Sequence, residues 1–513
     1  MDSRKNYVVA VDIGSSELVI AVGSMAEGGT INIETVVAEP VTGVSAGMVD
    51  NSQTVAEALH RARARAEEEV GVAITDAYVS ISGRFVRCAR YTDHVFVEDS
   101  ENRISKHDLV ALRERMRNVK AADGEVIMDF FPLCYKSDIG TELKNPVGCY
   151  SKQLSSTYNF ILCEHVAKDR LRRVFLDAGI KIRDIYAGAA VIADSLVTSD
   201  EKEDGVAIVD IGSGVTDVAI YRGGVLCYIA SIPMGGSALN TDILGYDKNI
   251  PSRMVENLKK QCGSAVVKLT PDDMIQVRNR GRAIKPIPRL NLAAVIEARM
   301  TDIAEYVWNE IRDAGYAKKL SAGIVLTGGG ASLEHVAELF NKVTGQEVRV
   351  ACAEVGVDSA SLEMVSSPNM TLAVSMLLRG AKEGACPVGV LQTPSPKSVM
   401  QEASAAQPAQ PYAQPYAQPA QPAQPAQPAE PQTLNQRFGA ATTPETPAAP
   451  TATPVVPNAT PLTSNADGYE DDVDKDEDIE RGGFFSRWWK NKIKKGLDDA
   501  FRNPEDEDDG DDY

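Results

Sequence analysis

A short motif, VDIGS, occurs twice in the chain, at residues 11–15 and again at residues 209–213. Each copy follows an apolar run that is typical of a β-strand, and a second apolar run comes after it. Each copy therefore predicts a strand, a tight turn and another strand. A single hairpin of this kind is common in β-sheets. Two copies in equivalent contexts, about two hundred residues apart, form an internal repeat and are much stronger evidence of a shared role.

The composition of the chain changes near residue 384. Up to that point, β-rich runs such as VAIVDI and AGIVLTGG alternate with helical periods such as HDLVALRERMRNV. This alternation predicts an α/β fold. Residues 387–461 then contain 17 of the 27 prolines, with Ala, Gln and Thr between them. Such a segment buries too little apolar surface to fold, so we expect a disordered linker after the folded part.

Charge and cysteine content argue against two classes of site. The formal net charge is -19, and residues 385–513 hold 21 acidic and 10 basic residues, or -11 of that total. A general nucleic-acid binder needs a basic face, so we expect no nucleic-acid partner. The eight cysteines form no CxxC pair, which favours buried thiols in a reducing cytosol over a metal site. We find no secretory signal or membrane span, and expect a cytosolic protein that meets a membrane from its surface.

The repeated hairpins carry the residue types that bind phosphate. Glycines and small hydroxyl side chains let backbone N–H groups approach phosphate oxygens, and an aspartate at each strand end can hold a magnesium ion through its waters. Two such turns that face each other would hold the phosphates of a nucleotide, whereas the alternative is two ordinary glycine turns. A third glycine run, GIVLTGGGASLEHVAELF at 323–340, predicts a strand, a close backbone contact and a helix. It is neither a Walker loop nor a dinucleotide fingerprint.

These three segments, in this order, resemble the nucleotide site of the actin, heat-shock chaperone and sugar-kinase superfamily. Within it, residues 5–384 resemble most closely the FtsA family of bacterial division proteins. The segment VAIVDIGSGVTDVAIYRGG is similar to the second phosphate segment, and IPMGGSALNTDI, ENLKKQCG and DIYAGAAVIADSLV are similar to the following loop, the adenosine contact and the interlobe helix. The segments YVSISGRFVRCARYTDHVFV, KNPVGCY and YNFILCEH resemble the extra subdomain of FtsA proteins.

The resemblance implies an actin-like, two-lobed α/β fold with an α+β subdomain inserted in the first lobe. The expected parts are the first lobe (1–83 and 164–200), the inserted subdomain (84–163), the second lobe (201–384), a disordered linker rich in Pro, Ala, Gln and acidic residues (385–480), a membrane-targeting amphipathic helix (481–502) and an acidic disordered tail (503–513).

The resemblance also implies ATP and magnesium as ligands between the lobes, with at most slow ATPase activity. Asp12 and Asp210 would position magnesium through water, and the identity of any catalytic residue stays open. The expected nucleotide contacts are Asp12, Gly14, Ser15, Ser16, Asp210, Gly212, Ser213, Gly214, Thr216, Gly235, Gly236, Glu256, Lys259, Gly263, Gly328, Gly329 and Gly330. Several relatives carry lysine near the place of Glu17. A carboxylate there would repel phosphate and weaken nucleotide binding, unless Glu17 points to solvent.

Residues 481–502 predict a helix that lies in a membrane interface. On a helical wheel the large apolar residues share one half of the circle, most of the basic residues fall on the other half, and the segment carries seven basic against two acidic residues. This pattern is typical of an amphipathic helix on anionic lipid, and the groove of a partner protein is the alternative. FtsA proteins end in such a helix, so the resemblance agrees. The expected lipid contacts are Phe484, Phe485, Trp488, Trp489, Ile493, Leu497, Arg487, Lys490, Lys494 and Lys495.

The first functional hypothesis is a scaffold that binds ATP, polymerises on the cytoplasmic face of the inner membrane at midcell and anchors the tubulin-like protein FtsZ there. The resemblance implies that segment 292–311 binds the C-terminal tail peptide of FtsZ, where Arg299 would pair with a peptide carboxylate, and that other division proteins also bind. The alternatives are a sugar or metabolite kinase of the same superfamily and a cytoplasmic, FtsA-like adaptor of pilus assembly. The basic aromatic tail favours the scaffold.

Overall fold

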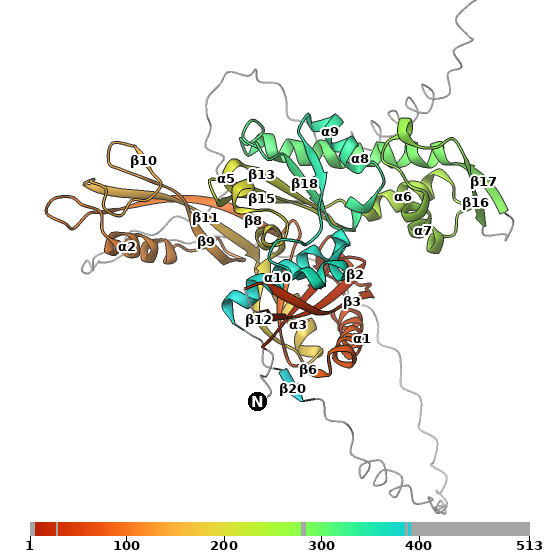
Figure 1. Cartoon of the computed structure of the whole chain (residues 1–513), viewed down its shortest axis with the longest axis horizontal. Coiled ribbons are helices and arrows are strands. Elements are labelled where there is room, and N and C mark those ends of the chain that lie inside the picture. The colour runs from red at the N-terminus through yellow and green to blue at the C-terminus, as the bar shows by residue number, and fades with distance from the viewer. Residues whose placement is uncertain (1–5, 27–28, 279–283, 385–387, 391–513) are drawn as a thin grey trace, which may run out of the picture. The chain divides into compact units, whose positions relative to one another are not determined.

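The computed structural model describes residues 6–26, 29–278, 284–384 and 388–390, all within one compact unit (Figure 1). The amphipathic helix and the acidic tail expected beyond residue 480 lie outside the described residues and stay predictions. None of the helices in the described ranges is long and apolar enough to cross a lipid bilayer.

Two five-stranded sheets with the same topology organise the described chain. The strand order is β3-β2-β1-β7-β12 in the first sheet and β15-β14-β13-β18-β19 in the second. In each sheet the first three strands along the chain are antiparallel neighbours, and the other two pair in parallel. The strands are β1 (Tyr7–Ile13), β2 (Glu17–Met25), β3 (Ile31–Pro40), β7 (Asp76–Ile81), β12 (Lys181–Ala187), β13 (Val206–Ile211), β14 (Thr216–Arg222), β15 (Val225–Ile232), β18 (Ile324–Thr327) and β19 (Val348–Val350). The shared order agrees with the internal repeat of the VDIGS motif.

Helices cover both sheets. Helix α1 (Ser52–Val70) packs on β2 and β3, and α10 (Thr371–Glu383) packs on β1, β2 and β7. Strand β2 accordingly has seven consecutive buried residues, as a strand covered on both faces does. On the second sheet, α6 (Gly236–Tyr246) and α9 (Val336–Thr344) pack against the long helix α8 (Arg289–Asp313), and α7 (Ser252–Cys262) packs against α6. The remaining elements are β4 (Val44–Ser45), β5 (Met48–Val49), β16 (Met274–Arg278), β17 (Ile284–Pro288), α4 (Gly188–Val191), α5 (Ser199–Asp204) and the 3-10 helices η1 (Ile192–Asp194), η2 (Val267–Leu269), η3 (Gly329–Ser332), η4 (Ser359–Val365) and η5 (Pro368–Met370).

Helix α10 belongs by sequence to the range 201–384, which we expected to form the second lobe. Its residues Leu372 and Leu377 nevertheless share one core with Val9 and Ile20 of the first sheet. The apolar periodicity of a helix shows that it has a buried face, but it does not show which sheet that face contacts. The chain therefore returns to the first sheet before the described part ends.

The last described residues form a short strand. Val388–Val390 are β20, which pairs antiparallel with β6 (Val72–Ile74). We expected the disordered linker to begin at residue 385, so the structure corrects this limit for these three residues. Valine favours strands, and the repetitive proline-rich sequence begins only after them.

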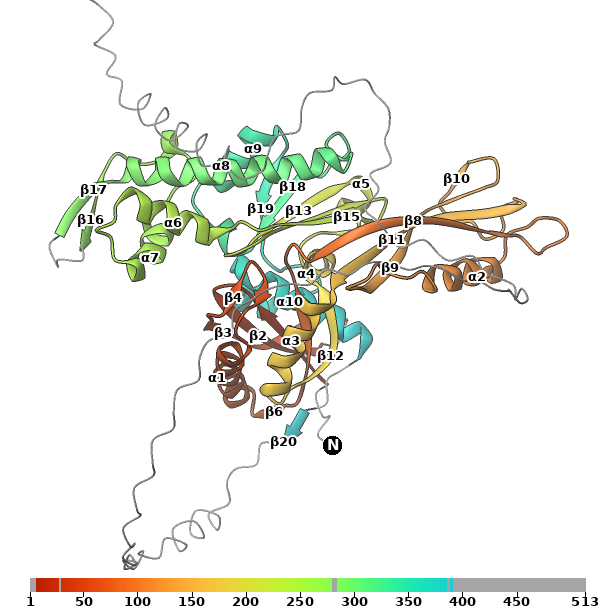
Figure 2. The ribbon, with the colours of Figure 1, turned by 180° about the vertical axis from the view of Figure 1, so that it is seen from behind.

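A separate four-stranded sheet lies between β7 and α3 (His165–Asp177) along the chain (Figures 1 and 2). Its order is β10-β9-β11-β8, and α2 (Lys106–Arg117) packs against it. Leu112 and Met116 of α2 share a core with Phe160 of β11. The strands are β8 (Val86–Phe96), β9 (Glu125–Lys136), β10 (Glu142–Leu143) and β11 (Gln153–Glu164). The inserted α+β subdomain is therefore present, while its expected limits of 84–163 stay a prediction.

The inserted subdomain contacts the second sheet at its edge strand, β15. The thiol of Cys88 in β8 donates to the carbonyl oxygen of Ile229 at 3.6 Å, and Nη2 of Arg90 donates to that of Cys227 at 3.4 Å. The side-chain amide of Asn159 in β11 also donates to the carbonyl oxygen of Cys227 at 3.4 Å. Because of these contacts, a displacement of β15 would also displace the residues of the subdomain that are hydrogen-bonded to it.

Candidate functional site

The two VDIGS motifs end in turns of the same geometry. In the first turn the N–H of Gly14 donates to the carbonyl oxygen of Glu17 at 3.0 Å, and in the second the N–H of Gly212 donates to that of Val215 at 2.9 Å. A Cβ atom on Gly14 or Gly212 would lie 2.8 or 2.9 Å from that same oxygen, so both positions need glycine. The repeat thus produces equivalent turns at the ends of the hairpins β1–β2 and β13–β14.

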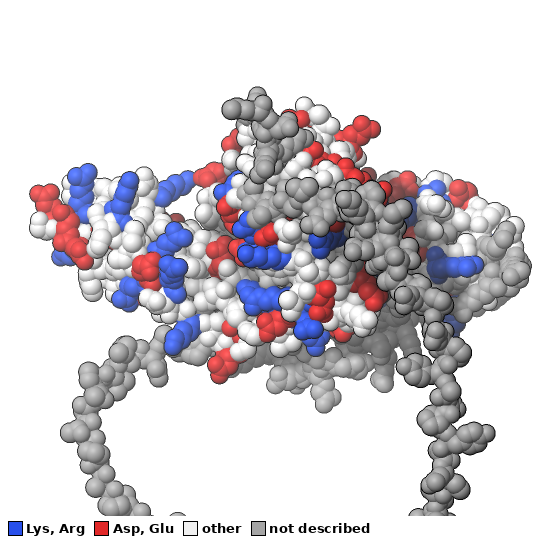
Figure 3. Space-filling model, turned by 90° about the horizontal axis from the view of Figure 1, so that it is seen from below, with Lys and Arg blue, Asp and Glu red and all other residues white. Residues whose placement is uncertain are grey.

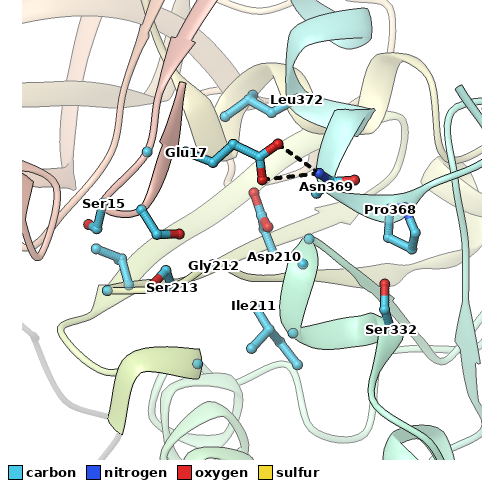
Figure 4. A pocket seen from close by; sticks show the side chains of 18 of the residues that line it. Ser15, Glu17, Asp210, Ile211, Gly212, Ser213, Ser332, Pro368, Asn369 and Leu372 are labelled. Carbon is cyan, nitrogen blue, oxygen red and sulfur yellow. Dashed lines mark hydrogen bonds between the residues drawn. The ribbon is translucent and has the colours of Figure 1, made fainter. Parts of the chain in front are cut away.

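These two turns face each other across a cavity of about 420 Å³ (Figure 4). A Cβ atom on Gly214 would lie 2.5 Å from Oγ of Ser15, so the tips of the turns approach closely. The hydroxyl of Ser15 also accepts a hydrogen bond from the N–H of Gly47 at 3.3 Å. The fold brings together residues from several distant segments. The expected nucleotide contacts that line the cavity are Asp12, Gly14, Ser15, Ser16, Asp210, Gly212, Ser213, Gly214, Gly236, Glu256, Lys259, Gly328, Gly329 and Gly330.

Three expected contacts lie outside the cavity lining. Thr216 is buried, and its hydroxyl donates to a backbone carbonyl oxygen at 2.8 Å. A Cβ atom on Gly235 would lie 2.4 Å from the carbonyl oxygen of Gly212, and one on Gly263 would lie 2.3 Å from that of Lys259. Packing alone accounts for the residue types at these three positions.

The TGGG run forms another side of the cavity. Gly328 has a φ of +82°, and a Cβ atom there would lie 2.0 Å from Oδ1 of Asp210, so only glycine fits. A Cβ atom on Gly330 would lie 2.4 Å from the side chain of Ile211. At Gly329 the nearest atom would be 3.8 Å away. Gly329 is therefore the position of this run that has room for a side chain.

Three aspartates with perturbed acidity line the cavity. Asp12 accepts a hydrogen bond from the hydroxyl of Ser80 at 2.6 Å, and Asp210 lies directly opposite Asp217 in the β13–β14 ladder. Burial raises the pKa of each aspartate, that of Asp210 well above its usual range and that of Asp217 to about 6. Repulsion from the other two carboxylates raises the pKa of Asp210 further. Each group therefore holds a proton, or attracts a cation, more strongly than an ordinary aspartate.

Two cations of α7 also reach the cavity. Nζ of Lys259 donates to the carboxylate of Glu256 at 2.8 Å and to the carbonyl oxygen of Gly236 at 2.9 Å. Nζ of Lys260 lies 3.5 Å from the same carboxylate. Burial lowers the pKa of Lys259. Burial alone would raise the pKa of Glu256, but hydrogen bonds from Lys259 and Asn240 outweigh it and lower that pKa.

Glu17 is one of the residues that line the cavity. Both of its carboxylate oxygens accept hydrogen bonds from Nδ2 of Asn369 at 3.4 Å (Figure 4). Asn369 lies in η5, immediately before Met370, the N-cap residue of α10. The equivalent position of the second turn is Val215. A carboxylate at this place is therefore specific to the first turn.

Part of the lining was missed by sequence reasoning. Asp217 could have been found, because a residue directly opposite Asp210 in an antiparallel pair shares its face of the sheet. Among the other missed residues are Ser332 in η3, Pro368 and Asn369 in η5, and Leu372 at the start of α10.

The cavity residues fit a hydrated magnesium ion. In the part of the chain that the structure describes, no three His, Cys, Asp or Glu side chains are placed to bind a metal ion directly. Asp12 and Asp210 stand at equivalent strand ends on the two sheets, and both line the cavity. Burial raises the pKa of both carboxyl groups, so each binds a proton or a cation more strongly than an exposed aspartate does. A hydrated divalent cation beside them would favour their ionised forms.

Arg299, the expected partner contact, is engaged within the second lobe. Its guanidinium donates to both carboxylate oxygens of Asp242, at 2.6 and 3.2 Å, and to Asp302 at 3.4 Å. Its side chain is 16% exposed. A peptide carboxylate would therefore have to share this arginine with Asp242. The expected lipid contacts at 484–497 lie outside the described residues.

Comparisons with known proteins agree on one family. The family model described as "Cell division protein FtsA" matches residues 207–375, which include the second turn and the TGGG run. The cell division protein FtsA of Escherichia coli (strain K12) is 28% identical over 385 residues, covering 73% of this chain and 90% of that protein. The FtsA protein of Bacillus subtilis (strain 168) is 29% identical over 353 residues, covering 68% and 79%. The chain is similar to FtsA proteins over most of its length.

The relatives that the chain resembles are named as cell division proteins. A solved structure, "PilM-PilN type IV pilus biogenesis complex", matches with a TM-score of 0.51 at 15% identity, over 73% of this chain and 98% of that one. At 15% sequence identity, this structural similarity shows only that the two proteins share a fold. The FtsA relatives favour neither the kinase hypothesis nor the pilus-assembly hypothesis.

Proposed function

We propose that the cavity binds ATP together with magnesium. The observation that carries this proposal is the pair of equivalent glycine turns that face each other from the two sheets. Backbone N–H groups in such turns can donate to phosphate oxygens from two sides. The volume of about 420 Å³ falls within the roughly 300–1,000 Å³ that is usual for small-molecule pockets. Asp12 and Asp210 would hold magnesium through its water ligands, and the ion would neutralise phosphate charge.

We place the nucleoside between α7 and the TGGG run. Glu256 and Lys259 offer hydrogen-bond partners for ribose hydroxyls or the base, and their mutual hydrogen bond at 2.8 Å fixes both side chains. Gly329 and Gly330 leave the backbone open to close approach by a flat base. In this placement the phosphates lie at the two turns and the base lies near α7.

The substitution Gly329→Asp tests the placement. A side chain fits at this position, so the variant should fold, while its carboxylate adds negative charge beside the nucleotide. We expect the ATP affinity measured by titration calorimetry to fall at least tenfold, or about 1.4 kcal/mol. Gly245→Asp is the matched control, because Gly245 also has free space around it and does not line the cavity. Equal ATP affinity in Gly329→Asp and wild type would contradict the proposed site.

We further propose a division scaffold with at most slow ATPase activity, which polymerises on the cytoplasmic face of the inner membrane at midcell and anchors FtsZ there. The similarity to FtsA proteins and the basic aromatic segment 481–502 support this proposal. On the face shown in Figure 3, Lys and Arg side chains are mixed with Asp and Glu. We therefore assign the attraction to anionic lipid to the tail segment and not to this face of the body.

We place the contact with the C-terminal tail peptide of FtsZ on α8, with Arg299 as one partner. Arg299→Lys keeps the charge but loses the two-pronged hydrogen bonding of a guanidinium, so we expect weaker peptide binding in fluorescence anisotropy. Arg312→Lys makes the same change at the exposed end of α8 and should bind the peptide like wild type. Melting curves check that each variant is folded. Equal peptide binding by all three proteins would exclude Arg299 from the contact.

A further inference from the structure

We infer that Glu17 makes the cavity select a nucleotide by its charge, admitting the complex with a divalent cation and rejecting the free nucleotide. The inference rests on the proposed nucleotide site and adds to it a residue that sets the charge of the ligand. It concerns a side chain that the turn itself does not need. The contacts of Glu17, the charge of its surroundings and the internal repeat carry the argument.

Four carboxyl groups line the cavity near the two turns, those of Glu17, Asp12, Asp210 and Asp217. The charge of Glu17 adds to the burial effect that raises the pKa of Asp12, and the charges of Asp217 and Asp12 add to the burial effect on Asp210. Repulsion between ionised carboxyl groups is stronger in a partly buried site than in water. The phosphates of a nucleotide would enter this negative field.

The cavity lysines do not compensate for this charge. Lys259 and Lys260 both lie within ion-pair distance of Glu256, at 2.8 and 3.5 Å. Lys259 also donates to the carbonyl oxygen of Gly236. Lys259, Lys260 and Glu256 together leave one positive charge on α7, against the carboxyl groups of Glu17 and three aspartates. A cation that arrives with the ligand would supply further neutralising charge near the turns.

Glu17 is held in place, so it cannot simply turn away from a ligand. Asn369 donates to both of its oxygens, and Asn369 directly precedes the N-cap of the 13-residue helix α10. The N-terminus of a helix attracts negative charge, and Met370, the N-cap residue, supplies no side-chain hydrogen bond of its own. Glu17 thus occupies a place that favours an anion, as Figure 4 shows beside Asn369 and Leu372.

The internal repeat shows that the turn does not require a carboxylate. The second turn has the same backbone hydrogen bond with Val215 at the equivalent position. A neutral side chain is therefore compatible with this geometry. The charge of Glu17 can therefore act on a ligand that binds in the cavity. A free nucleotide meets it with unscreened phosphate charge, whereas a nucleotide that carries a divalent cation meets it with that charge largely neutralised.

Titration calorimetry with ATP, once with excess magnesium and once with EDTA, tests the inference on the full chain. For the wild type we expect affinity to fall at least 100-fold in EDTA. Glu17→Gln keeps the shape and removes the charge, so we expect the ratio between the two buffers to shrink at least tenfold, chiefly through tighter binding of free ATP. Glu57→Gln removes the same charge from an exposed position of α1 and should leave the wild-type ratio unchanged.

A second variant keeps Glu17 and alters its neighbour. Asn369→Asp removes the donor and adds a further negative charge beside Glu17, so the ratio between the two buffers should rise above that of the wild type. The inference is overturned if Glu17→Gln shows the wild-type ratio, or if the wild type binds ATP equally in both buffers. If neither wild type nor Glu17→Gln binds ATP in either buffer, the proposed nucleotide site itself fails. Melting curves with all variants confirm that each is folded.

Discussion

Removal of the Asp217 carboxylate should stabilise the ligand-free protein at neutral pH. Asp217 is 6% exposed, and burial raises its pKa from 3.8 to about 6 although the hydroxyls of Ser231 and Ser82 lower it in part. A shift of about two pKa units corresponds to about 3 kcal/mol. Asp217→Asn keeps an oxygen that can accept the hydrogen bond from Ser231 but has no charge to bury. We therefore expect the variant to be more stable by up to about 3 kcal/mol.

The sign of the pH dependence follows from the direction of the shift. The folded state binds the proton of Asp217 more tightly than the unfolded chain does. Its stabilising contribution is therefore fully present below the unfolded pKa of 3.8 and is lost as the pH rises through about 6. The advantage of Asp217→Asn should accordingly be small near pH 4 and reach its full size near pH 7. The pKa values of Asp12 and Asp210 are raised as well, so the variant retains some of the pH dependence.

Thermal unfolding in EDTA without nucleotide, at pH 7.5 and at pH 4.5, measures this effect. With an unfolding entropy of about 2.1 cal/mol/K per residue over roughly 380 residues, 3 kcal/mol shifts the melting temperature by about 4 °C. Asp123→Asn is the control, because it removes the same charge from an exposed position of the inserted subdomain. A variant that melts at or below the wild-type temperature at pH 7.5, with an unshifted control, would refute the reasoning about the buried charge.

Two further predictions concern the tail and the body. Trp488→Glu with Trp489→Glu should abolish sedimentation with anionic liposomes and leave ATP affinity intact, because the proposed helix loses its largest apolar contacts. The control, Tyr412→Glu with Tyr416→Glu in the linker, should change neither liposome binding nor ATP affinity. Liposome binding by the tryptophan variant would exclude the helix as the anchor. Addition of Mg-ATP should slow amide hydrogen exchange in β14 and β15, and it should also change exchange in β8 of the inserted subdomain. If exchange changes only at the cavity residues, the cavity and the inserted subdomain are not coupled.

The duplicated fold and its turns could be predicted because their signals are local. A Gly between a strand that ends in Asp-Ile and a second strand fixes the turn by its own backbone, as Gly14 and Gly212 do. Helix α10 is different, since its apolar face fits either sheet and the choice depends on the assembled core. The pairing of β20 with β6 is likewise a contact between residues more than three hundred positions apart. Local patterns carry no information about such a partner.

The residues of the cavity likewise fall into those that could be predicted from the sequence and those that could not. The glycine turns and the TGGG run were open to prediction, because close backbone approach demands glycine in the sequence. Asn369 was not, since its place in the cavity depends on where η5 and α10 dock. The environment of Glu17 could not be predicted for the same reason: the sequence shows a carboxylate after the turn, but its partner lies 352 residues away. The docking of distant segments decides whether a charged residue faces solvent or a ligand.

The cavity and the inserted subdomain are joined by a short series of direct contacts. Asp217 lines the cavity and accepts a hydrogen bond from the hydroxyl of Ser231 on the neighbouring strand, β15. Two residues earlier on β15, the carbonyl oxygen of Ile229 accepts from the thiol of Cys88 in the subdomain. We expect a ligand that neutralises Asp217 to weaken the hydrogen bond from the Ser231 hydroxyl and so to act on β15. Because β15 is an edge strand with the subdomain as its outer neighbour, a small change in its position reaches β8 without a rearrangement of the core. Occupancy of the cavity can thereby influence the surface that the subdomain presents.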